Sequence, residues 1–345
     1  MEKECIGIIG AGGWGTALAC LLANKGYFID IWTLEDEVAE EINSSRRNTT
    51  YLPGARIPEG VKASTSIEEV VGKNSNIFLV VPSRVMRPVV REVQRYLRDD
   101  AYILHGAKGI EEDTLMRMSD VIKSELPSKF YPRIAVLSGP THAEEVAQGI
   151  PTAAVVASNE LSVAHHMQDL LMAPTFRIYT SLDMVGVELG GSLKNVVALA
   201  AGLGEGLGFG DNTKAALITR GLAEITRLGT AMDANPLTFA GLSGLGDLIV
   251  TCTSKHSRNR WAGIELSKGK SLEDVLSSTK MVIEGIPTAK ASYKLAKKHG
   301  IEMPITSKVY DVLYNRIQPK EAVLQLMTRD KTHELEDVFL PSMQD

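Results

Sequence analysis

The sequence predicts an α/β domain built on a parallel sheet, followed by an all-helical domain. In the first half, short apolar runs alternate with helical patterns, and a glycine-rich turn joins the first strand to the first helix. After about Gly190 the strand patterns disappear. Because alternating strands and helices build a parallel sheet with helices on both faces, we expect a first domain over residues 1–189 and a helical domain over residues 190–345.

Each element of the first domain follows from a local pattern. Residues 77–81 (IFLVV) form a continuous apolar run, which is typical of a strand buried on both faces. Gly26 closes one helical pattern and Pro127 stops another. The expected strands are residues 5–9, 27–32, 77–81, 102–105, 134–137 and 153–157. The expected helices are residues 14–25, 85–97, 115–126 and 161–172.

In the second domain, glycine and proline punctuate a helical periodicity that continues to the end of the chain. Ser271 with Asp274 predicts a helix start of the capping-box kind. Thr306 or Ser307 is the expected cap of a helix over residues 308–314. The other expected helices are residues 188–201, 214–232, 258–267 and 287–299.

Composition excludes several classes of protein. The 345 residues are 44% hydrophobic and suit two domains. A net charge of −5 argues against a general nucleic-acid binder. Three cysteines without metal or disulfide spacing predict free thiols in a reducing compartment, and the histidines form no metal-ligand group with them. With no signal peptide and no run of 18 apolar residues, we expect a cytoplasmic protein without a membrane span or a metal.

The glycine-rich turn predicts a dinucleotide site. Gly10, Gly12 and Gly15 fit G-x-G-x-x-G at the exit of the first strand, with Gly13 and Trp14 between them. Glycines let backbone amides approach a pyrophosphate at a helix N-terminus, where the helix dipole favours negative charge. The first domain is therefore expected to be a Rossmann-type domain that binds NAD or NADP.

The choice between NAD and NADP stays open at this point. Glu35 lies 20 positions after Gly15, the usual distance of the acid that contacts a ribose, but Thr33 and Leu34 occupy the strand exit. Arg46 and Arg47 are an alternative pair of ligands for a 2′-phosphate. Adjacent arginines on a polar stretch are more often solvated surface.

Two further strand ends carry candidate residues. Lys108 lies between glycines after the strand that ends at His105, and this position predicts a side chain in the ligand crevice of an open sheet. A solvated loop lysine is the alternative. Residues 138–143 form another strand-end turn of small residues, in which His142 is better explained by local packing or capping than by catalysis.

The helical domain carries the strongest cluster. Lys194 is the only cation in a small and apolar helical stretch, and a buried lysine costs several kcal/mol unless it is paired or does chemistry. Asp247 follows a glycine-spaced turn, with Thr251 and Cys252 shortly after it. Ser257 is the expected N-cap of a helix that begins with Arg258 and Asn259, a combination suited to a phosphate or carboxylate. The alternatives are a structural salt-bridge lysine and an exposed basic helix start.

Taken together, these segments closely resemble the NAD(P)-dependent glycerol-3-phosphate dehydrogenase family. The resemblance runs in order over nearly the whole chain, and GGSLKN, GLGDLIVTC and SRNR are its most specific motifs. The other matching segments are GAGGWGTALA, NTTYLPG, VVPS, HGAKGIE, LSGPTHAEEV and EGIPT. One departure is Thr33-Leu34, where many bacterial relatives have Arg or His, and this weakens any inference of NADPH preference.

The resemblance implies a role for each matching position. It implies that Lys194 is the acid/base, and our hypothesis adds Lys108 as an electrostatic aid and Asp247 as the residue that orients Lys194. It implies cofactor contacts at the glycine turn and at Trp14, Lys108, Ala143, Arg258, Val282 and Glu284. It implies substrate contacts at Lys108, Gly139, Thr141, Lys194, Asn195, Asp247, Thr251, Ser257, Arg258 and Asn259. The expected partners are a small phosphorylated triose and a second copy of the chain in a homodimer, with neither nucleic acid nor membrane.

The expected reaction is hydride transfer at C2 between sn-glycerol 3-phosphate and dihydroxyacetone phosphate, which by resemblance supplies phospholipid synthesis. A free lysine has a pKa of about 10.4, so its use as a base requires a downward shift of several units. We expect Lys194 in a cleft between the domains, within reach of the nicotinamide. Two rival readings remain: a β-hydroxyacid dehydrogenase, for which Ala198 replaces the expected Asn, and a non-catalytic NAD-binding sensor.

Overall fold

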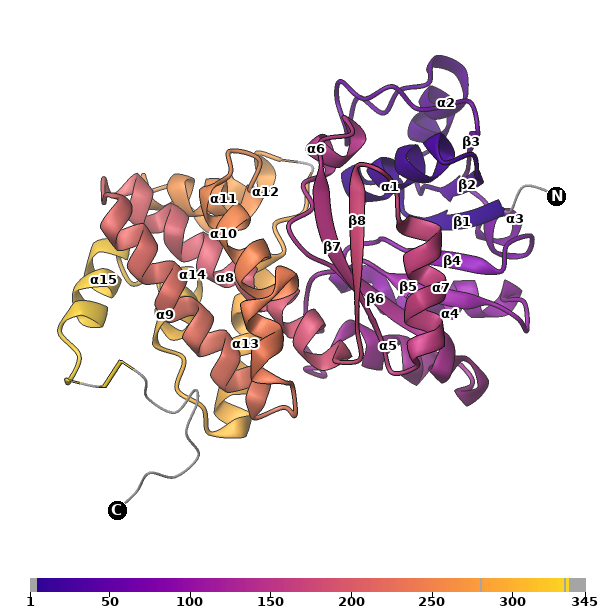
Figure 1. The fold of residues 1–345 in the computed structure, drawn as a ribbon. Coiled ribbons are helices and arrows are strands. Elements are labelled where there is room, and N and C mark those ends of the chain that lie inside the picture. The colour runs from indigo at the N-terminus through magenta and orange to yellow at the C-terminus, as the bar shows by residue number, and fades with distance from the viewer. Residues whose placement is uncertain (1–4, 280, 332, 335–345) are drawn as a thin grey trace. The chain divides into compact units, whose positions relative to one another are not determined.

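The structure, a computed structural model, describes residues 5–279, 281–331 and 333–334. Its contacts divide the chain into two compact units, which Figure 1 shows in ribbon form. We call Met1–Lys108 with Met118–Met184 the sheet unit, and Gly109–Arg117 with Val185–Asp345 the helical unit. The boundary near residue 184 lies close to the expected one at 189/190, but the assignment of residues 109–117 differs from the expected division.

The sheet unit contains an eight-stranded sheet in the order β3-β2-β1-β4-β5-β6-β7-β8. The order reverses between β1 and β4, and open α/β sheets bind ligands at such a switch point. The expected strands are present with ends shifted by at most two residues, whereas the edge strands β3 and β8 were not predicted. The strands are β1 (Cys5–Ile9), β2 (Phe28–Trp32), β3 (Val61–Ser64), β4 (Asn76–Leu79), β5 (Tyr102–His105), β6 (Ile134–Ser138), β7 (Thr152–Ser158) and β8 (Phe176–Ser181).

The expectation of a parallel sheet needs one correction, because β6 and β7 pair antiparallel. They are joined through α6 (Ala143–Ala147), a helix of only five residues. An ideal methyl group on Gly13 would lie 3.8 Å from the Cβ atom of Ala143, so α6 stays beside the glycine turn. The chain therefore re-enters the sheet from the edge at which β6 ended, and β7 must run in the opposite direction.

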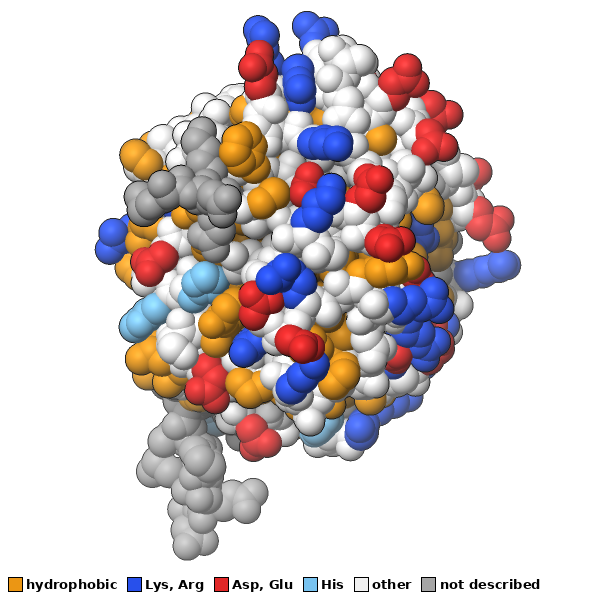
Figure 2. Space-filling model, turned by 90° about the vertical axis from the view of Figure 1, so that its right-hand side faces the viewer, with side chains coloured by type: hydrophobic (Ala, Val, Ile, Leu, Met, Phe, Trp, Pro, Cys, Tyr) orange, Lys and Arg blue, Asp and Glu red, His pale blue; other side chains and the backbone are white. Residues whose placement is uncertain are grey.

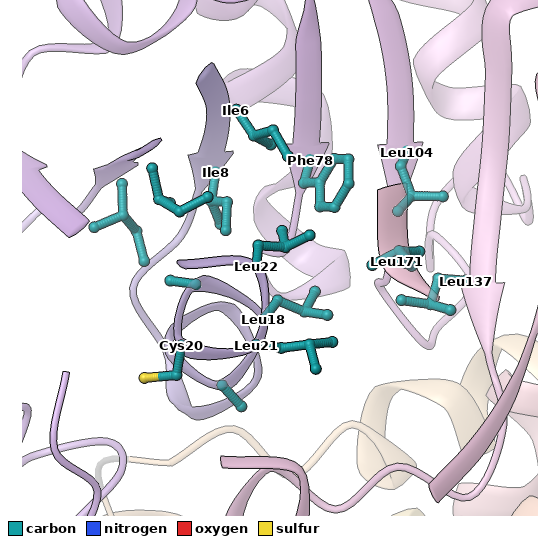
Figure 3. Packing of buried hydrophobic residues seen from close by; sticks show 14 of the residues in the cluster. Ile6, Ile8, Leu18, Cys20, Leu21, Leu22, Phe78, Leu104, Leu137 and Leu171 are labelled. Carbon is teal, nitrogen blue, oxygen red and sulfur yellow. The ribbon is translucent and has the colours of Figure 1, made fainter. Parts of the chain in front are cut away.

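Helix α1 (Gly13–Asn24) packs its apolar face onto the sheet. Leu18 and Leu22 of this helix lie against Ile8 of β1 and Phe78 of β4, and all four are fully buried (Figure 3). Burial of such side chains contributes about 1.5–3 kcal/mol each, which holds the N-terminus of α1 at the exit of β1. The other helices of this unit are α2 (Asp36–Ser45), α3 (Ile67–Val71), α4 (Met86–Val93), α5 (Met118–Glu125) and α7 (Leu161–Leu171).

The expected helix over residues 115–126 begins three residues late. Leu115 has a φ of 61°, a left-handed conformation that interrupts a helix, and Ile110 pairs with Arg117 in an isolated antiparallel bridge. Residues 109–117 belong to the helical unit because Ile110 is buried in its core and Arg117 Nη1 pairs with Glu188 Oε2 at 2.5 Å. The Ser192 hydroxyl also donates to the carbonyl of Gly109 at 3.2 Å.

The helical unit is built around α8 (Met184–Gly206), which begins before the expected residue 188. This helix is long and apolar enough to cross a membrane, but 94% of its most apolar window is buried inside the protein, as in a core helix. The surrounding helices are α9 (Asp211–Thr230), α10 (Asp247–Thr253), α11 (Arg258–Ser267), α12 (Leu272–Ser277), α13 (Gly285–His299), α14 (Pro304–Tyr314) and α15 (Pro319–Met327).

Two of the three expected helix caps are confirmed. Ser271 and Asp274 form a capping box, and the Ser257 hydroxyl accepts a hydrogen bond from Arg260 N. The expected cap at Thr306 or Ser307 is wrong, because α14 begins at Pro304. Its first amides are satisfied instead by the carboxylate of Glu224, a residue of α9 far away in the sequence.

Side chains of both charge signs are mixed on the face of the molecule that Figure 2 shows. Hydrophobic side chains reach this face in small groups between the charged ones. Scattered apolar side chains are normal on protein surfaces, so they do not mark a site.

Candidate active site

The glycine turn has the geometry that a close approach of backbone to ligand requires. Gly10 has a φ of 116°, and a methyl group there would lie 2.6 Å from the carbonyl oxygen of Val80. A methyl group on Gly15 would collide with the carbonyl oxygen of Gly10. A methyl group on Gly12, by contrast, would meet nothing within 4 Å. Positions 10 and 15 thus need glycine for the fold, whereas position 12 leaves the N-terminus of α1 open.

A buried asparagine that the sequence analysis did not single out braces this turn. Asn48 Nδ2 donates to the carbonyl of Ala11 at 2.8 Å and to the Thr16 hydroxyl at 2.9 Å. The Thr16 hydroxyl itself donates to Ala11 at 3.2 Å. Asn48 lies within the NTTYLPG segment, but a bond that spans 37 residues leaves no local pattern in the sequence.

Two predicted cofactor residues lie beside the turn. Trp14 stands next to the exit of β5, because a methyl group on Gly106 would lie 2.9 Å from the indole Nε1. Ala143 lies next to Gly13, as described above. The structure therefore brings Gly13, Trp14 and Ala143 together at the carboxyl edge of the sheet.

Lys108, Gly139 and Thr141 are also brought together in the sheet unit. Lys108 Nζ donates to the carbonyl oxygen of Gly139 at 3.0 Å, and the Thr141 hydroxyl reaches the same oxygen at 3.2 Å. Gly139 has a φ of 137°, which favours glycine. His142 occupies the N-cap position of α6 without a side-chain capping bond.

Lys194, Asp247 and Thr251 form a buried cluster in the helical unit. Lys194 is 5% exposed and forms an ion pair with Asp247 Oδ1. Its Nζ also donates to the Thr251 hydroxyl at 2.8 Å, and that hydroxyl donates to the backbone carbonyl of Asp247 at 2.6 Å. Asp247 and Thr251 together therefore fix the position of the Lys194 nitrogen atom.

Close packing fixes the elements that carry the cluster. A methyl group on Gly190 of α8 would lie 2.6 Å from the carbonyl oxygen of Ser243, in the turn that leads into α10. Burial raises the pKa of Cys252, next to Thr251, to about 12. The Cys252 thiol therefore stays protonated at neutral pH and is no candidate nucleophile.

Asn195 and Asn259 connect three helices next to this cluster. Asn259 Nδ2 donates to Asn195 Oδ1 at 2.9 Å, and Asn259 Oδ1 accepts from the backbone N–H of Gly285 at 2.8 Å. Helix α13 begins at Gly285, directly after Glu284. Val282, two residues before Glu284, is half-buried. The amide of Asn259 thus joins α8, α11 and the start of α13.

Helix α11 begins with an exposed arginine, and the N-terminus of this helix is capped. Arg258 is exposed, whereas Ser257 is buried and caps the helix. Arg260 Nε donates to Glu205 at 2.8 Å, and its guanidinium forms a second contact with the other carboxylate oxygen. The sequence analysis missed this pair, because Glu205 lies 55 residues earlier on α8.

A glycine turn at the switch point of a doubly wound sheet, with a buried ion-paired lysine in a helical unit, defines a dinucleotide-dependent dehydrogenase class. Family models agree: residues 5–164 match the N-terminus and residues 183–324 the C-terminus of NAD-dependent glycerol-3-phosphate dehydrogenase. The chain belongs to this family.

Individual relatives cover almost the whole chain. A glycerol-3-phosphate dehydrogenase [NAD(P)+] of Pelotomaculum thermopropionicum is 52% identical over 97% of this chain and 96% of its own length. One of Bacillus licheniformis is 50% identical over 96% of each chain. The crystal structure of glycerol-3-phosphate dehydrogenase from Coxiella burnetii superposes with a TM-score of 0.90 at 38% identity, covering 95% of this chain and 99% of its own.

Proposed function

We propose that this chain interconverts sn-glycerol 3-phosphate and dihydroxyacetone phosphate reversibly, with NAD or NADP as the hydride carrier. The observation that carries the proposal is the buried Lys194–Asp247 pair in a chain of this family. Burial of an ion pair contributes little net stability on its own, so a catalytic use accounts better for its presence than a structural one.

The residues of the sheet unit fit a dinucleotide. At Gly12 no side chain covers the N-terminus of α1, where backbone amides and the helix dipole favour a pyrophosphate. Gly10, Trp14, Lys108 and Ala143 line the same edge. When bound, the nicotinamide supplies or accepts the hydride.

Lys194 has the proton-transfer role in this proposal. In the reductive direction its Nζ donates a proton to the C2 oxygen of the substrate, and in the oxidative direction it takes that proton back. Asp247 and Thr251 orient the nitrogen through the contacts described above. Lys108, Gly139 and Thr141 are the further proposed substrate contacts.

The phosphate of the substrate is assigned to the start of α11. Arg258 supplies a guanidinium at the N-terminal end of the helix, Ser257 and Asn259 flank it, and Asn195 bonds to Asn259. Charge-assisted hydrogen bonds contribute about 1.5–3 kcal/mol each, so Arg258→Ala should raise the KM for dihydroxyacetone phosphate by roughly 10- to 150-fold. Lys255→Ala, which removes an exposed cation nearby, is the matched control. An unchanged KM in Arg258→Ala would contradict this assignment.

Val282 and Glu284 remain proposed cofactor contacts at the start of α13. A homodimer, a cytoplasmic location and a supply role for phospholipid synthesis complete the proposal. Sedimentation equilibrium tests the dimer, because a monomer at micromolar concentration would contradict it.

The experiment that tests the function compares substrates. Purified protein with NADH, and separately with NADPH, is given dihydroxyacetone phosphate or a β-ketoacid, and nucleotide oxidation is followed. We expect turnover of dihydroxyacetone phosphate and at least about a hundredfold lower kcat/KM for the unphosphorylated acid, because two or more phosphate contacts are lost. Preference for the acid would indicate a β-hydroxyacid dehydrogenase. Binding without turnover of either would indicate a sensor.

A further inference from the structure

A carboxylate stands at the exit of β2, beside the glycine turn. Glu35 Oε2 accepts a hydrogen bond from the Thr33 hydroxyl at 2.8 Å, and its Oε1 accepts one from the Tyr51 hydroxyl at 2.7 Å. Glu35 also occupies the N-cap position of α2. Two hydroxyl groups from different segments therefore fix the orientation of this carboxylate.

The same network ties the carboxylate to the N-terminus of α1. Tyr51 N donates to Asn48 Oδ1 at 3.1 Å, and the amide group of Asn48 holds the carbonyl of Ala11. A methyl group on Gly13 would lie 2.7 Å from the carbonyl oxygen of Tyr51. On the other side of the turn, Gly10 N donates to the carbonyl of Trp32, the last residue of β2, at 3.0 Å. The position of Glu35 relative to the glycine turn is thus fixed from two sides.

The Glu35 carboxylate accepts both of these hydrogen bonds, as an ionised carboxylate does. The hydrogen bond to Glu35 raises the pKa of Tyr51 to about 12, so the phenol remains a donor at neutral pH. An ionised carboxylate only accepts hydrogen bonds and can accept several at once. This chemistry suits the hydroxyl groups of a ribose, and the negative charge disfavours a phosphate in the same place.

Arg46, one of the two candidates for a 2′-phosphate, is directed to the wrong edge of the sheet. Its Nη1 donates to the carbonyl of Val61 at 2.7 Å. Val61 is the first residue of β3 and pairs with Ile29, whereas Ser64 at the other end pairs with Trp32. Three residues of strand separate these ends by about 10 Å, so the Arg46 guanidinium lies away from the exit of β2.

Arg47, the other candidate, is exposed and lines a cavity of about 470 Å³ together with Arg56. It therefore serves as the competing explanation that the experiment must separate.

We propose that Glu35, held by Tyr51 and Thr33, makes this chain select NAD(H) over NADP(H). The carboxylate accepts hydrogen bonds from the adenosine ribose hydroxyls of NAD(H) and repels the 2′-phosphate of NADP(H). The inference rests on the nucleotide site of the proposed function, and it adds a preference that the site alone does not specify.

The test is direct binding of NADH and NADPH to the full chain, measured by titration calorimetry without substrate. For the unmodified chain we expect NADH to bind at least about tenfold more tightly than NADPH, the scale of one charge-assisted hydrogen bond. Glu35→Gln keeps the shape of the side chain, and Thr33 and Tyr51 can donate to or accept from its amide. It should lower the NADH-to-NADPH affinity ratio by about tenfold or more without changing the melting temperature.

Two further variants complete the design. Tyr51→Phe should lower the same ratio by a smaller factor, because the carboxylate remains but loses one orienting bond. Arg47→Ala should leave the ratio unchanged. Equal or tighter binding of NADPH by the unmodified chain, or a ratio that depends on Arg47 and not on Glu35, would overturn the inference. Failure to bind either nucleotide would instead contradict the proposed function.

Discussion

At the scale of single residues, the environment of each side chain distinguishes a structural role from a functional one. Gly10 and Gly15 are needed by the backbone itself, because added methyl groups would meet carbonyl oxygens. Gly12 differs, since its φ of −64° suits any residue and the space around it is open. The fold therefore does not require glycine at position 12, which is consistent with the nucleotide site proposed there.

Gly12→Ala should weaken nucleotide binding while sparing the fold. A methyl group there stands where a pyrophosphate would approach the amides of α1, so we expect NADH affinity to fall at least about tenfold. Gly210→Ala is the matched control, because Gly210 is also an N-cap glycine with open space around it, in the helical unit. Both variants should melt within a few degrees of the parent in thermal denaturation. Unchanged NADH affinity in Gly12→Ala would contradict the assignment of the site.

Sequence patterns single out the candidate residues that sit in motifs but not the residues that support them. The glycine turn, Lys194 and Asp247 follow from spacing and composition. Asn48 and Glu205 were missed because their partners lie 37 and 55 residues away. Such long-range hydrogen bonds depend on how elements pack, which a pattern in one segment does not specify.

At the scale of elements, the N-terminus of helix α14 is stabilised by a side chain of another helix. The first amides of α14 are held by Glu224 of α9: Ile305 N donates at 2.5 Å and Thr306 N at 3.1 Å, and the Thr306 hydroxyl adds a third bond at 3.1 Å. Glu224 is 2% exposed. The contact joins two long helices of the helical unit.

Glu224 should make stability depend on pH. Burial raises its pKa from 4.5 to about 7 in the folded chain. At pH values between 4.5 and 7, Glu224 is ionised in the unfolded chain but still protonated in the folded chain. The stabilisation present below pH 4.5 is therefore lost as pH rises towards 7. The loss is about 3 kcal/mol, at 1.36 kcal/mol for each unit of pKa.

Glu224→Gln removes this titration. In urea unfolding at pH 5.0 and 7.5, the free energy of unfolding of the parent minus that of the variant should fall by about 2.4 kcal/mol as pH rises. Taking the difference cancels the other titrating groups. A difference that does not change with pH would contradict the shifted titration.

At the scale of the whole molecule, the two units are interleaved along the chain. Residues 109–117 pack Ile110 into the core of the helical unit, and Arg117 pairs with Glu188. The sequence analysis placed one boundary at 189/190, because the strand pattern ends there. It did not predict that residues 109–117 join the helical unit, because residues 109–114 carry no periodic pattern and residues 115–117 were assigned to the helix that follows.

The interleaving predicts that residues 185–345 do not fold stably alone. Without residues 109–117 the fragment leaves Glu188 buried without Arg117, and breaking a buried pair costs about 3–5 kcal/mol. Circular dichroism should show no cooperative thermal transition for this fragment. A fusion of residues 109–117 to residue 185 through a glycine-serine linker is the control and should restore one. A cooperative melt of the bare fragment would contradict the division of the units.

Fold class and the order of most elements were predictable, because buried parallel strands and amphipathic helices carry strong periodic signals. The edge strands β3 and β8 were not, since each is covered on one side only and has a mixed pattern. The antiparallel pairing of β7 also escaped prediction, because its direction is set by where α6 packs.

The account depends most on Lys194 as the proton donor to the substrate. The direct measurement is the single-turnover rate of NADH oxidation by dihydroxyacetone phosphate in Lys194→Ala, with NADH affinity measured in parallel. Because this variant leaves Asp247 buried without its partner, the double variant Lys194→Ala/Asp247→Asn serves as a control for folding.

We expect both variants to bind NADH as the parent does and to react about 10²- to 10⁴-fold more slowly, the usual contribution of general acid catalysis. A single-turnover rate within a few-fold of the parent, in a variant that is folded and binds NADH, would contradict the account.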